Sequence, residues 1–289
     1  MSVTSFHTAT SVDDAIAALA AGARPVAGGT DLVVGDRSGK SRLPDSIVAI
    51  HRIPALHGVE SRGDGSLRLG ALASHREIAA NGDICVRFTA LADACAIVGS
   101  HATRAQGTIG GNVMNASPAM ETGGPLICFG ATATLQSPSG SREVALDDLW
   151  SGPGATTAEA DELLVEIQIP APADGTGSAY LRLEYRRQME IAVVGATAVV
   201  TVTEGTVTDT RIAMTALSPT IRRVPEAEAA LIGTNGGADA VEAAAAAVSA
   251  AATPISDVRG SAEYRRAMAA VIARRAIETA LERAGKGSA

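Results

Sequence analysis

AGGTD at residues 27–31 and TIGGNVMNASP at residues 108–118 are two glycine-rich turns that lie far apart in the chain. Each follows a stretch that reads as a strand or the approach to one. Small side chains let several backbone N–H groups point into one concavity, and glycine permits the positive φ that such a nest needs. Loops of this kind bind diphosphates without many cations. Two of them in one chain therefore predict a phosphate-containing ligand.

The first turn offers backbone donors from Gly28, Gly29 and Thr30, with the Thr30 hydroxyl as a further donor. The alternative is a tight strand-to-helix turn without a ligand, and the presence of the second turn makes that alternative less favoured. Asp31 carries a negative charge that repels phosphate. We therefore expect Asp31 to cap the following helix or to bind a backbone N–H.

Composition restricts the class of protein. The chain has 289 residues, of which 46% are hydrophobic and 19% charged, as in ordinary globular proteins that divide into two or three subdomains. A net charge of −7 argues against nucleic acid or an anionic membrane as a partner. Lys40 and Lys286 are the only lysines, so a site that needs a cation must almost always use arginine.

The cysteines and histidines do not predict a metal centre or a disulfide framework. Cys85, Cys95 and Cys128 include no CxxC pair, and an iron–sulfur cluster normally needs four thiolates. The five histidines show no metal-ligand spacing. The first ten residues do not resemble a signal peptide, and the alanine-rich run at 243–252 is too short for a membrane span. We expect a cytoplasmic protein in a reducing compartment, without membrane insertion.

Hydrophobic periodicity and turn signals predict three units, at residues 1–57, 58–173 and 178–285. The expected strands lie at 24–27, 47–50, 67–71, 131–136, 163–169, 179–185, 191–203 and 208–217. The expected helices lie at 11–21, with Ser11 as its N-cap, and at 88–98, 238–252 and 261–284. A hairpin is expected around residues 63–65, and a Ser/Pro/Gly turn at 137–141 is expected to divide two strand-like stretches.

Several segments resemble the FAD-binding medium subunit of the molybdenum hydroxylases, a family that includes the flavoprotein subunits of carbon monoxide dehydrogenase and bacterial xanthine dehydrogenase. These segments are AGGTDL at 27–32, LRLGALASH at 67–75, GTIGGNVMNASPAMET at 107–122, EIAVVGATA at 190–198 and DVRGSAEYRRAMAAVIARRAIETAL at 257–281. The resemblance covers nearly the whole chain. It implies an α+β protein with a two-subdomain FAD-binding fold of the vanillyl-alcohol-oxidase type, followed by a C-terminal α+β domain.

The resemblance also implies which residues bind the cofactor. FAD would lie extended between the two N-terminal subdomains, with its pyrophosphate on both glycine turns and its isoalloxazine ring facing the third unit. The residues implied in the two turns and their extension are Ala27, Gly28, Gly29, Thr30, Asp31, Thr108, Gly110, Gly111, Asn112, Met114, Asn115, Ser117 and Glu121. Gly110, Gly111 and Asn112 match positions on the pyrophosphate and ribityl chain, and Thr108 lies close by. Met114 matches an apolar position near the ring, although core packing explains it more readily on sequence alone.

The implied residues nearer the flavin ring each have an alternative interpretation. Glu121 stands where the commoner form of the family carries aspartate, and the alternative is a solvated carboxylate at a turn. Arg182 stands where relatives often carry lysine, and a cation there favours the reduced flavin; the alternative is an exposed arginine on a strand. Leu163 and Leu164 match an apolar position that packs on the ring, and β-core leucines are the alternative.

The chain offers no acid/base pair, no catalytic residue of its own and no iron–sulfur ligand set, so bound FAD would carry the chemistry. By resemblance, a molybdopterin-binding large subunit oxidises a substrate and a small subunit with two [2Fe–2S] clusters relays the electrons. FAD would pass them to NAD⁺, oxygen or a quinone, in a dimer of heterotrimers. The alternatives are a flavin-free structural or assembly subunit and a stand-alone flavin oxidoreductase.

Overall fold

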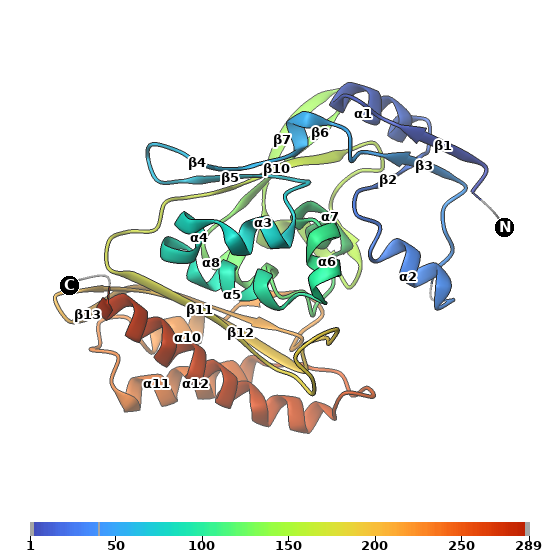
Figure 1. Ribbon diagram of the computed structural model, residues 1–289. Helices are drawn as coiled ribbons and strands as arrows, with labels where there is room; N and C mark the ends of the chain where they lie inside the picture. Colours follow the sequence, from blue (N-terminus) through green and yellow to red (C-terminus); the bar gives the residue numbers. More distant parts are fainter. Residues whose placement is uncertain (1–2, 40, 287–289) are drawn as a thin grey trace.

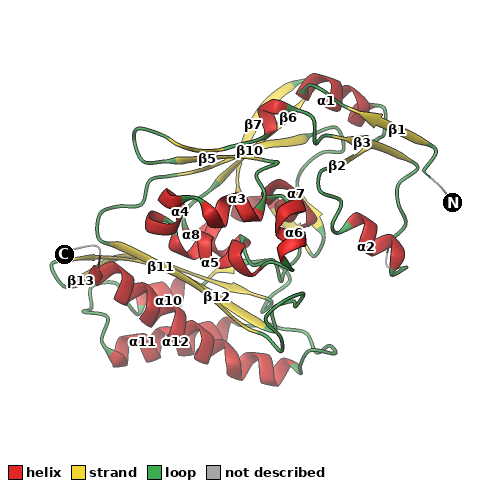
Figure 2. Ribbon diagram, viewed as in Figure 1, coloured by secondary structure: helices red, strands yellow, loops and turns green. Residues whose placement is uncertain are grey.

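The computed structural model describes residues 3–39 and 41–286, and mixes helices with sheets in layers (Figures 1 and 2). In space, the first layer is a large sheet, the second a group of short helices, the third a second large sheet and the fourth the long C-terminal helices. A small sheet with helix α1 lies beside the first of the large sheets. The predicted α+β class is confirmed.

The N-terminal unit has a parallel sheet in the order β1-β3-β2. Its elements are β1 Ser5–Thr8, α1 Val12–Ala20, β2 Arg24–Val26, α2 Leu32–Arg37, β3 Ser46–Ala49 and the 3₁₀ helix η1 Pro54–Leu56. The Ser11 hydroxyl begins α1 by accepting a hydrogen bond from the Asp14 amide at 3.1 Å, as predicted. Asp31 occupies the N-cap position of α2 without a side-chain capping hydrogen bond, so the expected capping is wrong, and a bond to another backbone N–H stays a prediction.

The second unit has an antiparallel sheet in the order β4-β5-β10-β6-β7. Its strands are β4 Val59–Ser61, β5 Leu67–Gly70, β6 Thr132–Ser137, β7 Gly140–Ala145 and β10 Leu163–Ile169, with a small hairpin of β8 Trp150–Gly152 and β9 Ala155–Thr156. The predicted hairpin around residues 63–65 joins β4 to β5. The predicted turn at 137–141 leads from β6 into β7, a strand that the sequence pattern did not reveal.

The second unit also contributes the helices between the two large sheets (Figure 1). They are α3 His75–Ala80, α4 Gly82–Arg87, α5 Thr89–Ile97, α6 His101–Gln106, α7 Ile109–Asn115 and α8 Gly123–Cys128, with α9 Leu146–Leu149 following β7. The expectation of a strand before the second glycine turn is wrong, because α6 precedes it. Ser100 caps α6 by accepting from the Thr103 amide at 3.2 Å, and only an isolated bridge between Ser74 and Thr108 has strand character.

The C-terminal unit has an antiparallel sheet in the order β11-β12-β13-β14. Its elements are β11 Thr176–Leu183, β12 Val194–Thr203, β13 Thr206–Thr215, β14 Arg222–Arg223, α10 Pro225–Ala229, α11 Ala238–Ala251 and α12 Ala262–Lys286. Helices α11 and α12 cover one face of this sheet, and α5 and α8 pack on the other (Figure 1). β12 is buried continuously from residue 194 to 200, because a strand covered on both faces has no solvent side.

Candidate functional site

The first glycine turn retains a run of unused backbone donors. The amides of Gly28, Gly29 and Thr30 make no hydrogen bond to the described residues, although the neighbouring Gly29 carbonyl accepts from the Val33 amide at 3.0 Å. Gly29 has φ +68°, a left-handed conformation that lets successive N–H groups converge. All three residues are only half-buried. This run of unused amides, which we call the nest, is of the kind that binds anions in proteins.

The first turn packs directly against the chain that leads into the second. A Cβ placed on Gly28 would lie 1.8 Å from the Gln106 carbonyl oxygen, and one on Gly107 would lie 3.6 Å from the Thr30 hydroxyl. Real Cβ atoms essentially never approach a neighbour below 3.0 Å, so any side chain at residue 28 must push the two turns apart. The structure thus brings the two turns into contact, as the shared-ligand hypothesis requires.

The second turn is not an amide nest, which corrects one part of the sequence interpretation. The Ile109 and Gly110 amides donate to the carbonyls of Ala73 and Ala71, each at 2.9 Å. The Gly111 amide donates to the Thr108 hydroxyl at 3.1 Å, so Thr108 serves as the N-cap of α7. Because the Asn112 amide also bonds within this turn, to the Thr108 carbonyl at 3.0 Å, a ligand here must meet side chains and the exposed face of Gly111.

Asn112 links the second turn to an acidic residue farther along the chain. Its Oδ1 accepts a hydrogen bond from the Thr122 hydroxyl at 2.6 Å, which fixes the orientation of the amide. The Nδ2 group, which makes no hydrogen bond to a described residue, is then what Asn112 can offer to a ligand. Thr122 follows Glu121 in sequence, so this contact places the second turn beside Glu121.

Glu121 and Arg182 form a buried ion pair across two units of the fold. Their side chains are 8% and 1% exposed, so the alternatives of a solvated carboxylate and an exposed strand arginine are both wrong. Arg182 Nε also donates to Glu184 Oε2 at 2.5 Å. Burial raises the pKa of Glu121, and the guanidinium of Arg182 opposes that shift. The site thus holds one cation between two carboxylates.

The remaining predicted residues are placed less favourably for a ligand. Met114 is half-buried against the core, and Leu163 and Leu164 are 3% and 4% exposed in two different cores. The two leucines therefore match the β-core alternative and present almost no surface to a ring. Ala27 and Ser117 are half-buried and Asn115 is exposed. Of these positions, Ala27 and Ser117 adjoin the groups described above in sequence.

His75 is a neighbour of the two turns that sequence reasoning did not single out. It is 2% exposed, its amide donates to the Gly107 carbonyl at 3.2 Å, and a Cβ on Gly107 would lie 3.3 Å from its ring. Burial lowers the pKa of His75 from 6.5 to about 4, with the Arg104 charge adding to the shift. Its only sequence signal was its place in the LRLGALASH segment. His75 is therefore a neutral ring that supports the contact between the turns.

A pH-dependent stability follows from the lowered pKa of His75. The folded pKa lies below the unfolded value, so the folded state binds fewer protons between pH 6.5 and 4, and stability falls as the pH falls through this window. The loss at pH 5 amounts to about 2 kcal/mol. We expect His75→Leu to lose less unfolding free energy than the wild type between pH 7.5 and pH 5, measured by urea denaturation. Equal losses in both proteins would contradict a buried neutral His75.

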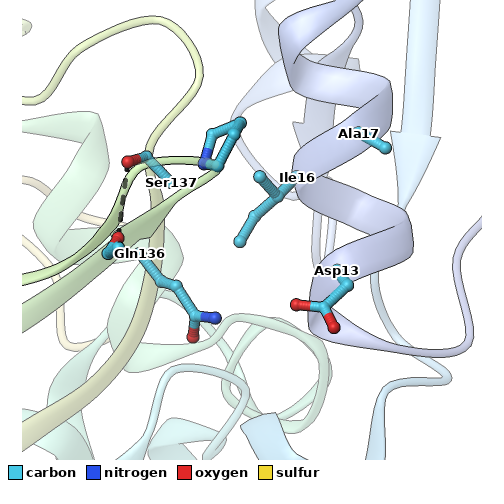
Figure 3. A pocket seen from close by; sticks show the side chains of 7 residues that line it. Asp13, Ile16, Ala17, Gln136 and Ser137 are labelled. Atoms are coloured by element: carbon cyan, nitrogen blue, oxygen red, sulfur yellow. Dashed lines mark hydrogen bonds between the residues drawn. The ribbon is translucent and has the colours of Figure 1, made fainter.

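Two surface pockets lie away from these residues. The one in Figure 3 is formed between α1 and the β6–β7 hairpin, where Asp13, Ile16 and Ala17 face Gln136 and Ser137. A second is lined by Cys85, Asp93 and Arg283 among small residues. Neither pocket includes a residue of the predicted site.

Metal ligands and membrane-spanning helices are two further features that the described part of the chain could contain. No group of three or more His, Cys, Asp or Glu side chains there could hold a metal ion. All three cysteines are free, with Cys95 and Cys128 buried. Among residues 3–39 and 41–286, no helix combines the length and hydropathy needed to cross a lipid bilayer.

Comparison with known proteins agrees with this geometry. The family described as "FAD binding domain in molybdopterin dehydrogenase" matches residues 2–172, and "CO dehydrogenase flavoprotein C-terminal domain" matches residues 153–280. The chain is 32% identical to the carbon monoxide dehydrogenase medium chain of Hydrogenophaga pseudoflava, over 96% of this chain and 97% of that one. It is 29% identical to the xanthine dehydrogenase FAD-binding subunit of Escherichia coli O157:H7, over 97% of both.

Solved structures show the same similarity in three dimensions. Carbon monoxide dehydrogenase from Hydrogenophaga pseudoflava superposes with a TM-score of 0.93 at 33% identity, over 98% of both chains. Quinoline 2-oxidoreductase from Pseudomonas putida 86 superposes with a TM-score of 0.90 at 26% identity, also over 98% of both. The two family matches together span nearly the whole chain, and one relative is more than 30% identical to it, so the family of the chain is established. The chain belongs to the family of FAD-binding medium subunits of the molybdenum hydroxylases.

Proposed function

We propose that this chain is the electron-transfer flavoprotein subunit of a molybdenum hydroxylase or dehydrogenase, taking electrons from [2Fe–2S] clusters of a partner and passing them to an external acceptor. Membership of the FAD-binding family supports the cofactor, and the names of the relatives support a multisubunit oxidoreductase. The acceptor would be NAD⁺, oxygen or a quinone. The proposed partners are a molybdopterin-binding large subunit and an iron–sulfur small subunit, in a cytoplasmic dimer of heterotrimers.

The observation that carries the proposal is the nest at Gly28, Gly29 and Thr30, seated against the α6–α7 turn. Three consecutive unused amides in an acidic protein fit a diphosphate group, because N–H dipoles attract an anion without a cation. A side chain at Gly28 would collide with the Gln106 carbonyl, so the close approach of the turns depends on glycine. The residues present therefore fit FAD.

Each group of the site has a distinct task in this proposal. FAD, when bound, supplies the capacity to accept two electrons and release them to an acceptor. The amides of residues 28–30 would bind the pyrophosphate, and Asn112 Nδ2 would donate to a polar oxygen of the cofactor. Arg182 would hold a positive charge on the flavin side, with Glu121 and Glu184 keeping its guanidinium in place.

Three units of the chain would each contribute part of the FAD site. Residues 1–57 and 58–173 would form the two FAD-binding subdomains, because the first nest comes from one and α7 from the other. Residues 178–285 would form the C-terminal flavoprotein domain, which contributes Arg182. The ligand would then lie where all three meet.

The visible absorption spectrum of the purified chain tests the proposal. We expect bands of oxidised flavin, with FAD as the chromophore released on denaturation, either in the isolated chain or in the complex with its partners. The complex is expected to copurify with iron and molybdenum. A complex that contains both metals but no flavin would support the assembly-subunit alternative, and a flavin-containing chain without metal-containing partners would support the stand-alone oxidoreductase.

A further inference from the structure

Arg265 is a buried arginine in the first turn of α12, within the SAEYRR segment at residues 261–266. It is 3% exposed, and its Nη1 donates to the Val193 carbonyl at 2.7 Å and to the Ala216 carbonyl at 3.4 Å. Its Nη2 pairs with Asp257 Oδ1 at 2.6 Å. A buried guanidinium is costly to desolvate unless such partners compensate for it. One side chain from the last helix thus joins three separate segments.

The segments around Val193 and Ala216 each lead to a backbone contact between the C-terminal unit and the FAD-binding part. Val193 ends the β11–β12 connection, defined as residues 184–193, which carries Glu184. Within this connection the Met189 amide donates to the Gly99 carbonyl at 2.9 Å. Ala216 follows β13, and its amide donates to the Pro118 carbonyl at 2.8 Å.

Both contacts lie beside the Glu121–Arg182 pair. Pro118 is close in sequence to Glu121, and the carbonyl of Glu190, next to Met189 in the connection, accepts a hydrogen bond from Arg182 Nη1 at 3.4 Å. Ala216 has φ +62° and Met189 has φ +52°, conformations that cost non-glycine residues about 1 kcal/mol or more each. Such conformations persist only where surrounding contacts hold them. The bond to Arg265 is one of those contacts for Ala216.

We propose that Arg265 is a positioning residue that holds Ala216 and the β11–β12 connection against the FAD-binding part, and thereby fixes the Arg182–Glu121 group relative to the cofactor. The last clause rests on the proposed FAD function. Arg265 acts through other residues, because its two Nη groups bond Val193, Ala216 and Asp257 and the side chain is buried in the C-terminal unit, away from both glycine turns. This gives the SAEYRR segment a role in the site although it lies in a different unit from both glycine turns.

The adjacent arginine provides a matched control. Arg266 is exposed, and its Nε donates to the Ala252 carbonyl at 3.4 Å, a contact that involves neither the connection nor Ala216. Replacing either arginine by methionine removes the same charge from the same turn of α12. A difference between the two variants therefore reports the contacts of Arg265 and not the charge or the helix.

Limited trypsin digestion and flavin measurements on Arg265→Met, Arg265→Lys and Arg266→Met test the proposal. Arg186 and Arg187 are exposed cleavage sites within the connection, and Arg62 in the β4–β5 hairpin is an internal reference. We expect Arg265→Met to speed cleavage at residues 186–187 about tenfold or more relative to Arg62, as for loss of a charge-assisted hydrogen bond. FAD dissociation should accelerate, with an altered midpoint potential. Lysine should restore part of each property, and Arg266→Met should match the wild type.

The digestion and the flavin measurements together distinguish a wrong role for Arg265 from a wrong proposed function. Digestion does not involve FAD, so unchanged cleavage at residues 186–187 in Arg265→Met would overturn the role of Arg265. Faster cleavage with unchanged FAD dissociation and potential would also overturn it, because the residue would then support only the fold. A wild-type protein that carries no FAD alone or with its partners would instead refute the proposed function. Circular dichroism spectra of the variants are the control for correct folding.

Discussion

The Gly28→Ala variant is expected to lose FAD, with an affinity at least about a hundredfold lower than that of the wild type. The new Cβ would lie 1.8 Å from the Gln106 carbonyl oxygen and 2.6 Å from its carbon, and both are backbone atoms that no rotamer change can move. The first turn would have to shift away from the α6–α7 turn. Because the nest amides at residues 28–30 are then displaced from the second turn, one ligand can no longer contact both.

Gly29→Ala is the matched control for this variant. Gly29 has φ +68°, so alanine there costs about 1 kcal/mol of conformational strain. Its Cβ would meet only Val26 and Val33 at ordinary distances of 3.6 and 3.7 Å. We expect Gly29→Ala to keep FAD with an affinity reduced by about tenfold or less. Flavin content and titration of the flavin-depleted protein with FAD measure both variants, and equal retention or equal loss would refute the packing argument.

Arg182→Met is expected to destabilise the protein by about 3–5 kcal/mol and to lower the midpoint potential of the bound flavin. The substitution leaves Glu121, 8% exposed, and Glu184, 24% exposed, without the cation between them. An uncompensated buried carboxylate either remains at high cost or takes up a proton. Removal of a positive charge near the flavin also disfavours the electron-rich reduced form. Denaturant unfolding and redox titration measure the two effects.

Two further variants separate the charge effect from the loss of side-chain packing. Arg274→Met breaks an ion pair with Glu242 at 3.8 Å whose side chains are 45% and 67% exposed, so a change below about 1 kcal/mol is expected. Adding Glu121→Gln to Arg182→Met removes the buried carboxylate and should recover most of the lost stability. An unchanged flavin potential in Arg182→Met would show that Arg182 does not face the flavin, whatever its effect on unfolding.

Local sequence signals predicted most of the regular structure. The Ser11 cap, the glycine turn between β4 and β5 and the apolar run of β12 each involve residues close in the chain, so their patterns can be recognised before the fold is known. The elements that were missed, among them α2 to α4, α6 to α10, β1, β7 to β9 and β14, are at most 7 residues long. Their hydrophobic periodicity is too weak to distinguish a helix or strand from a loop.

The sequence by itself determined the family, the cofactor class and the two turns, because these depend on which residue types stand at fixed spacing. Only the tertiary structure decided how the turns work. The amides of residues 109–112 are occupied by partners that include Ala71 and Ala73, whereas those of residues 28–30 are unused. The sequence also did not determine that Glu121 is buried against Arg182, or that Leu163 and Leu164 are buried in hydrophobic cores. A side chain's partners and solvent exposure depend on segments distant in the chain, which only folding brings into contact.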